Sequence, residues 1–189
     1  KRQDDWGGKC SAVAKLIDNN EGGQDMIIGR NMDLTLSNKS AYIVRTAVPN
    51  KKKTVGLAYS HRDYAPNYND ALKNGLTGDF EKLLPFLMDD ILNEDGLYME
   101  INMREPETWP DGTPKYASSG TNPGKERIYV FSIMRYIEES CSTVSEAIEY
   151  LDNFDIYTPQ NPVTSWNYGF MIADPSGHYA VIELINNEI

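Results

Sequence analysis

Hydrophobic and polar positions alternate over two stretches near the start of the chain, as they do in half-buried strands. These stretches are residues 11–17, SAVAKLI, and residues 25–33, DMIIGRNMD. The segment between them is rich in Asn and Gly, which favours a turn. We therefore predict a hairpin whose antiparallel pairing places Cys10, at the start of the first strand, beside Arg30 and Asp33 at the end of the second.

Three further strand signals follow along the chain. Residues 41–48 and 54–59 lie on either side of a Pro-Asn-Lys turn and predict a second hairpin. A turn at residues 94–96 leads into another strand. Residues 165–185 predict a last hairpin around an Asp-Pro-Ser-Gly turn.

Apolar residues recur at helical spacing in the second half of the chain. Residues 126–140 show this spacing and predict a helix. A second helix is predicted after Ser142 or Thr143 as N-cap, with Glu146 placed for a capping box with Thr143. The apolar segment 83–92, in contrast, contains a proline that argues against a simple helix. This order of strands, helices and strands favours an α+β layered domain over a doubly wound sheet.

Composition narrows the classes of partner and chemistry. The 189 residues are enough for one compact domain with a hydrophobic core. The formal net charge of -10 argues against nucleic acid as a partner, because phosphate binding rests on clustered Lys and Arg. No apolar run approaches the ~18 residues of a membrane span. With two histidines and two cysteines we expect no metal site and no cofactor, and a Cys10–Cys141 disulfide stays open if the protein is exported.

The neighbours of Cys10 decide how it is interpreted, because a free cysteine is most often a buried, inert residue. After Cys10 come the motif GRNMD at residues 29–33, NEDGL at residues 93–97 and the last predicted hairpin. In this order the segments resemble the choloylglycine hydrolase family, which includes bile salt hydrolases and penicillin V acylases. Its members begin their mature chain with a cysteine and carry a Gly/Ala-Arg-x-Met-Asp motif on the next strand. The resemblance runs from Cys10 to about Glu183.

The resemblance implies a four-layer αββα sandwich of the N-terminal-nucleophile hydrolase type, of which residues 10–189 form the N-terminal portion. It also implies hydrolysis of a linear amide through an acyl-enzyme. The expected partner is a small amphipathic amide such as a conjugated bile acid, penicillin V or an N-acyl amino acid. Cys10 is then the nucleophile. Residues 1–9 are a leader that must be removed, because the free α-amine of Cys10 serves as the base.

Three further residues complete the site that the resemblance implies. Arg30 supplies fixed positive charge beside the thiolate, and Asp33 orients the α-amino group; the alternative is an exposed Arg30–Asp33 pair near a strand end. Counting from NEDGL places Met103 where the family has an oxyanion donor, with Asn102 one residue before it. Asn102 serves as this donor if a bulge shifts the register by one residue; otherwise Asn102 is a structural strand residue.

Two departures from the family leave a second interpretation open. Residues 1–9 precede Cys10, and the family's later Asn-Ser-Pro segment and a later arginine have no counterpart in the chain. We therefore expect a partial enzyme, which forms a homo-oligomer or pairs with a missing C-terminal segment. The alternative is a non-catalytic binding or scaffold domain of the same fold in which Cys10 is never exposed. The leader weakly favours export, and the sequence leaves the compartment undetermined.

Overall fold

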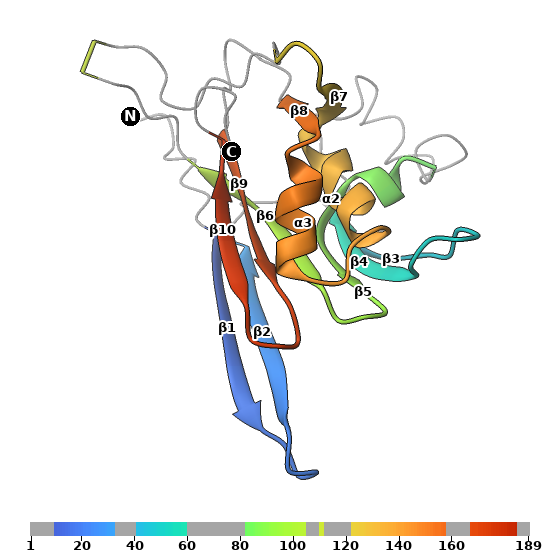
Figure 1. Ribbon diagram of the computed structural model, residues 1–189, viewed down its shortest axis with the longest axis vertical. Helices are drawn as coiled ribbons and strands as arrows, with labels where there is room; N and C mark the ends of the chain where they lie inside the picture. Colours follow the sequence, from blue (N-terminus) through green and yellow to red (C-terminus); the bar gives the residue numbers. More distant parts are fainter. Residues whose placement is uncertain are drawn as a thin grey trace, which may run out of the picture.

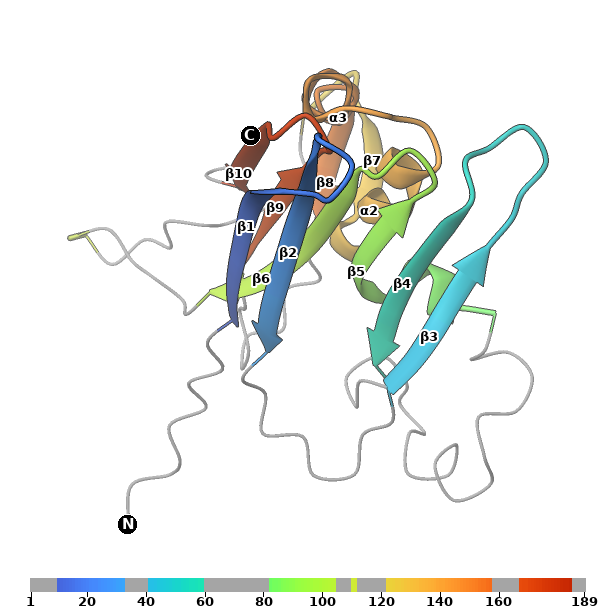
Figure 2. The same cartoon turned by 90° about the horizontal axis from the view of Figure 1, so that it is seen from below.

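A computed structural model of the chain describes residues 10–32, 41–59, 82–104, 110–111, 122–157 and 167–184. The described elements are β1 (Cys10–Asp18), β2 (Gln24–Met32), β3 (Ala41–Thr46), β4 (Thr54–Tyr59), η2 (Leu84–Phe86), β5 (Met88–Asn93), β6 (Tyr98–Arg104), β7 (Glu126–Tyr129), α2 (Val130–Glu138), α3 (Val144–Leu151), β8 (Phe154–Tyr157), β9 (Asn167–Ala173) and β10 (Tyr179–Glu183). A six-stranded antiparallel sheet has the order β10-β9-β6-β5-β4-β3. The helices lie on one face of this sheet and the β1–β2 hairpin lies on the other, which confirms an α+β layered domain (Figure 1, Figure 2).

The hydrophobic core lies between the sheet and the helices. Met99 and Ile101 of β6 are buried there, together with apolar residues of β9, α2 and α3. Successive side chains of a strand point to opposite faces. Tyr98, Glu100 and Asn102 of β6 therefore lie on the other face, toward the hairpin. This alternation separates an apolar face, which packs under the helices, from a polar face.

The predicted N-terminal hairpin is confirmed. β1 and β2 pair antiparallel, beginning with Cys10 opposite Met32. Asn19 organises the turn, because its Oδ1 accepts hydrogen bonds from the N–H groups of Glu21 and Gly23 at 3.1 and 2.8 Å. The hairpins predicted further along the chain are also confirmed, as β3–β4 and β9–β10.

Side chains near both ends of the hairpin contact the sheet. Close to its turn, Leu16 packs on the β9–β10 turn, where a Cβ added to Gly177 would lie 2.5 Å from Leu16 Cδ1. Gly177 has a φ of 90°, in the left-handed region that favours glycine. Near the open end of the hairpin, Arg30 reaches β5 and β6. The two contacts hold opposite ends of the hairpin on the sheet.

One predicted helix is shorter than expected, and the proline-containing segment is not a simple helix, as predicted. Residues 126–129, predicted as part of a helix, form β7, and α2 begins only at Val130. β7 pairs in parallel with β8, which follows α3 in the chain, so the local periodicity carries no signal of this pairing. The apolar segment 83–92 divides into the short 3-10 helix η2, with Pro85 in its first turn, and the strand β5.

The second helix begins as predicted, with Thr143 as its N-cap. Thr143 Oγ1 accepts a hydrogen bond of 3.2 Å from the Glu146 N–H. The Glu146 carboxylate accepts from the Ser142 N–H at 2.6 Å, one residue before the position used in a capping box. Asp174, in the β9–β10 turn, also accepts from the Val144 N–H at 3.0 Å. The turn that contacts the hairpin therefore also caps α3.

Candidate functional site

Cys10 is the first residue of β1, and its side chain is half-buried. Ala12 pairs with Arg30 in the same ladder. Cross-strand partners project to the same face, so Cys10 and Arg30 share a face as diagonal neighbours, roughly 7–8 Å apart. The structure thus brings these two predicted site residues together. The third, Asp33, lies outside the described residues, as does the predicted leader of residues 1–9.

Arg30 is enclosed between the hairpin and the sheet, and only 8% of its side chain is exposed. Its Nη1 donates to Asp90 Oδ2 at 3.1 Å, and its Nη2 donates to the Ile101 carbonyl oxygen at 2.6 Å. Its Nε lies 3.6 Å from Glu100 Oε2. Arg30 is therefore not the exposed residue that the surface-pair alternative requires, because strands far away in the sequence surround it.

Glu100 connects three polar side chains, although it is fully buried. Its carboxylate accepts hydrogen bonds from the Tyr98 hydroxyl and from Asn102 Nδ2, each at 2.9 Å. It also faces Arg30. A buried carboxylate needs such partners, because an isolated buried charge is costly. Glu100 is thus the link between Arg30 on β2 and Asn102 on β6.

Asp90 lies directly opposite Glu100 on the neighbouring strand β5. Its second oxygen, Oδ1, accepts a hydrogen bond of 3.2 Å from the Leu57 N–H of β4. The register between β4 and β5 shifts between Leu57 and Ala58, which is a β-bulge or a similar irregularity. Bulges redirect side chains and are frequent next to active sites. Asp90 is therefore held on one side by β4 and on the other by Arg30.

The charges of this cluster influence one another. Burial lowers the pKa of Arg30, but the negative charges of Asp89, Asp90 and Glu100 outweigh it and raise that pKa above its ordinary value. Burial raises the pKa of Asp90, against the opposing effect of the Arg30 charge. Burial and the Glu100 charge also raise the pKa of Tyr98, so its hydroxyl keeps its proton and donates. Arg30 stays charged and faces more than one acidic side chain.

Asn102 lies on the same strand face as Glu100. β6 pairs with β9 in regular register from Tyr98 to Arg104, with Asn102 opposite Gly169. The register shift that was expected for Asn102 is therefore absent from this strand pair, and Asn102 lies on the hairpin side of the sheet without it. Asn102 Oδ1 is buried without a hydrogen-bond partner among the described residues, while its Nδ2 donates to Glu100.

The open end of the hairpin and the end of β6 lie side by side. β1 contacts β6, and both views show the start of β1 beside the arrowhead of β6 (Figure 1, Figure 2). Cys10 belongs to the first of these ends and Asn102 to the second. Cys10, Arg30 and Asn102 therefore belong to one region, on the sheet face opposite the helices.

Three residues of this region, Asp90, Glu100 and Tyr98, are not among the site residues predicted from the sequence. One signal was available for two of them: Tyr98, Glu100 and Asn102 occupy alternate positions of a predicted strand and hence one face. Asp90 carried no comparable signal, because its role depends on the pairing of β5 with β4 and β6.

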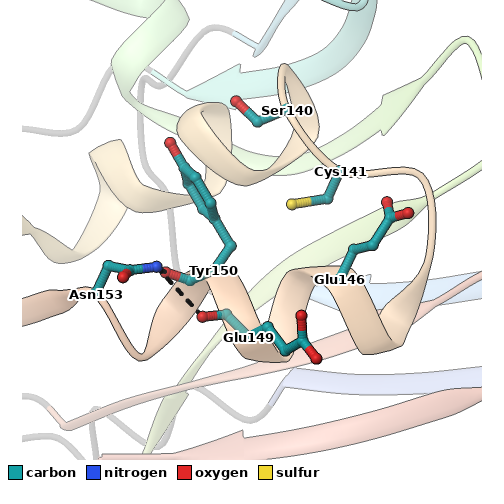
Figure 3. A pocket seen from close by; sticks show the side chains of 6 residues that line it. All are labelled: Ser140, Cys141, Glu146, Glu149, Tyr150 and Asn153. Atoms are coloured by element: carbon teal, nitrogen blue, oxygen red, sulfur yellow. Dashed lines mark hydrogen bonds between the residues drawn. The ribbon is translucent and has the colours of Figure 1, made fainter.

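A separate hollow of about 330 Å³ lies on the helical side of the molecule (Figure 3). Its lining residues come from α3 and the segments next to it: Ser140, Cys141, Glu146, Glu149, Tyr150 and Asn153. Burial and the nearby Glu146 and Glu138 charges raise the pKa of the Cys141 thiol to about 11. At neutral pH this thiol is protonated and is a poor nucleophile. The hollow is therefore no second candidate for nucleophilic chemistry.

In the part of the chain that the structure describes, no group of three or more His, Cys, Asp or Glu side chains is arranged to hold a metal ion. None of the described helices is long and apolar enough to cross a membrane. Both cysteines are free thiols.

Solved structures resemble this fold. Two variants of the conjugated bile acid hydrolase from Clostridium perfringens match with a TM-score of 0.58 each, at 20% and 19% sequence identity. Each match covers 94% of this chain and 49% of the other, so this chain spans about half the length of those proteins. The likeness confirms the predicted fold class, of which the described layers form a part.

Sequence comparison identifies the family. No curated protein sequence matches the chain. The family model of linear amide C–N hydrolases, choloylglycine hydrolase family, matches residues 11–189, beginning directly after Cys10. This match covers nearly the whole sequence and agrees with the fold. The chain belongs to the choloylglycine hydrolase family of linear amide C–N hydrolases.

Proposed function

We propose that this protein hydrolyses the acyl C–N bond of a linear amide, with Cys10 as the nucleophile. Family membership supports the class of reaction. The substrate that we propose is a small amphipathic amide such as a conjugated bile acid, penicillin V or an N-acyl amino acid. The observation that carries the proposal is the position of Cys10 at the start of β1, on the same face as the charged Arg30.

A cysteine that is the first residue of its chain contains both a nucleophile and a base. Its α-amino group, with a pKa of about 7.7 to 8.0, accepts the thiol proton near neutral pH. The thiolate attacks the carbonyl carbon, the C–N bond breaks, and the leaving amine takes the proton. Water then hydrolyses the thioester to a carboxylic acid and restores the thiol. This chemistry requires removal of residues 1–9, because the nitrogen of a Lys9–Cys10 peptide bond cannot act as the base.

Three residues assist this reaction in our proposal. Arg30 provides positive charge close to the Cys10 thiolate, and its burial prevents water from screening that charge fully. Asp33 accepts a hydrogen bond from the α-amino group. Asn102 donates to the oxyanion: an amide nitrogen carries two hydrogens, and the one directed at Glu100 leaves the other for the substrate.

The first test is replacement of the nucleophile. Because no other group provides the attacking sulfur, Cys10→Ala is expected to lower kcat/KM for amide hydrolysis by about a thousand-fold or more. A panel of glycine-conjugated bile acids, penicillin V and N-acyl amino acids serves as substrates, with release of the amine as the measurement. Cys141→Ala is the matched control and should retain activity. Hydrolysis at the unaltered rate in Cys10→Ala would refute the proposal.

The second test is the mass of the intact protein as isolated. A chain that begins at Cys10 supports the proposed base, and Cys10→Ser should then block or strongly slow removal of the leader. A chain that still carries Lys9, together with no turnover of any amide in the panel, would favour the alternative of a non-catalytic binding or scaffold domain.

A further inference from the structure

Among the described hydrogen bonds, those of Arg30 join the open end of the hairpin, where Cys10 lies, to the sheet. Another contact, Leu16 on Gly177, lies near the closed end of the hairpin. Arg30 lies opposite Ala12, two residues from Cys10 along β1. The position of Cys10 over the sheet therefore depends in part on how firmly the Arg30 guanidinium is held.

Asp90 is well placed to hold this guanidinium. Each of its two oxygens has one partner: Arg30 Nη1 at 3.1 Å and the Leu57 N–H at 3.2 Å. The Asp90 side chain is 20% exposed, whereas Glu100, the other acidic partner of Arg30, is fully buried and lies farther from it, at 3.6 Å. Among the described residues, the direct charge-assisted hydrogen bond from Arg30 to a carboxylate is thus the one to Asp90.

The backbone next to Asp90 makes this arrangement rigid. Gly56 of β4 lies so close to β5 that an added Cβ would meet the Asp90 carbonyl oxygen at 2.4 Å. Beside the shift in register, the Leu57 N–H donates to the Asp90 side chain. Asp90 therefore has little freedom to follow Arg30 if the hairpin moves, and it acts as a fixed point.

We propose that Asp90 is a positioning residue for amide hydrolysis: through its hydrogen bond to Arg30 it fixes the open end of the hairpin, and with it Cys10, against the sheet. This inference rests on the proposed function only for its effect on turnover. Its mechanical part, the restraint of the hairpin end, is independent of any reaction. A displacement of about 1 Å is enough to slow a positioned reaction by about 100-fold.

Hydrogen–deuterium exchange tests the mechanical part without any substrate. In Asp90→Ala, the amides of residues 11–12 and 30–32 are expected to exchange at least about ten-fold faster, because their end of the hairpin loses its anchor. The amides of residues 15–17, held by the Leu16 contact, should change less than about two-fold. Unchanged exchange at residues 30–32 would overturn the proposal, whether or not the protein proves to be an amidase.

Steady-state kinetics test the catalytic part. Asp90→Ala should lower kcat by about 10- to 100-fold and change KM by less than about three-fold, because a misplaced nucleophile affects the chemical step. Asp90→Asn keeps one acceptor oxygen for Arg30 but loses the one for the Leu57 N–H, so it should recover only part of the lost kcat. Asp90→Leu, which also lacks an acceptor for Arg30, carries both tests if Asp90→Ala fails to fold. Exchange and kcat equal to those of the unaltered protein in Asp90→Leu would then overturn the proposal.

Asp95→Ala is the control. Asp95 forms an ion pair with Lys52 and accepts from Ser142, but it is 41% exposed and lies in the turn before β6, away from the hairpin. Its replacement should leave both kcat and exchange of the hairpin unchanged. If hairpin exchange rises in Asp90→Ala while kcat stays the same, Asp90 is a structural residue and its positioning role is refuted.

Discussion

Two fully buried glutamates show how strongly the surroundings of a single residue decide its chemistry. Glu100 accepts hydrogen bonds from Tyr98 and Asn102 and faces Arg30. Glu138, in α2, has no hydrogen-bond partner for either carboxylate oxygen among the described residues. Burial raises the pKa of Glu138 well above its ordinary value. Glu138 therefore favours the neutral form in the native state.

This raised pKa makes a prediction about stability. The native state binds the Glu138 proton more tightly than the unfolded chain does, so the contribution of this residue is present below its ordinary pKa of 4.5 and is lost as pH rises toward the raised value. Glu138→Gln cannot ionise. At about pH 8 we expect this variant to be more stable than the unaltered protein by at least about 1 kcal/mol, with no gain at about pH 4.

Urea unfolding at several pH values measures this difference. The matched control is Glu149→Gln on the exposed surface of α3, which should shift stability by no more than about 0.5 kcal/mol at any pH. An equal stability difference between Glu138→Gln and the unaltered protein at low and high pH would show that Glu138 ionises normally in the native state.

At the scale of elements, the hairpin and the helical layer meet at the β9–β10 turn. Leu16 of β1 packs on Gly177 of this turn, and Asp174 of the same turn caps α3 through the Val144 N–H. The turn thus connects the two outer layers through the edge of the sheet. A change in this turn affects the placement of both neighbours.

Two glycines allow the docking of the hairpin to be tested separately from backbone strain. Gly177 and Gly124 have similar positive φ values, 90° and 94°, but an added Cβ at Gly124 meets nothing within 4 Å. Both alanine variants should lose about 1–3 kcal/mol from the left-handed backbone. Gly177→Ala should lose more in urea unfolding, because it also displaces Leu16. Combination with Leu16→Ala should add little further loss, whereas full additivity would mean that the two residues do not interact.

At the scale of the whole molecule, the two cysteines belong to different layers. Cys10 begins the hairpin on one face of the sheet, and Cys141 follows α2 on the other (Figure 1). Both are free. The disulfide left open by the sequence is therefore not formed in this structure.

A thiol titration checks this arrangement. In the native protein at about pH 8, Cys10 should react and Cys141 should stay largely unreactive, because Cys141 is buried and its pKa is raised to about 11. Both thiols should react after unfolding without reductant. In Cys141→Ala, the thiol that reacts in the native protein should remain, and the additional thiol that reacts after unfolding should be absent. The absence of reactive thiols after unfolding would show a disulfide instead.

The sequence by itself determined those features that depend on nearby residues. Alternation and turn residues predicted the three hairpins, and the spacing of Thr143 and Glu146 predicted the start of α3. The order of motifs identified the family, and it placed Cys10 and Arg30 together through the pairing of adjacent strands. Each of these signals lies within a short stretch of chain or within one hairpin, where local physical rules apply.

Only the tertiary structure decided which groups surround Arg30. Asp90 and Ile101 lie 60 and 71 residues from it in the sequence, and they meet it because the hairpin lies across β5 and β6. The same limit explains β7, whose partner strand β8 follows two helices later. Pairings of this kind depend on how complete layers pack against one another. The periodicity of one segment does not indicate which layer will cover it.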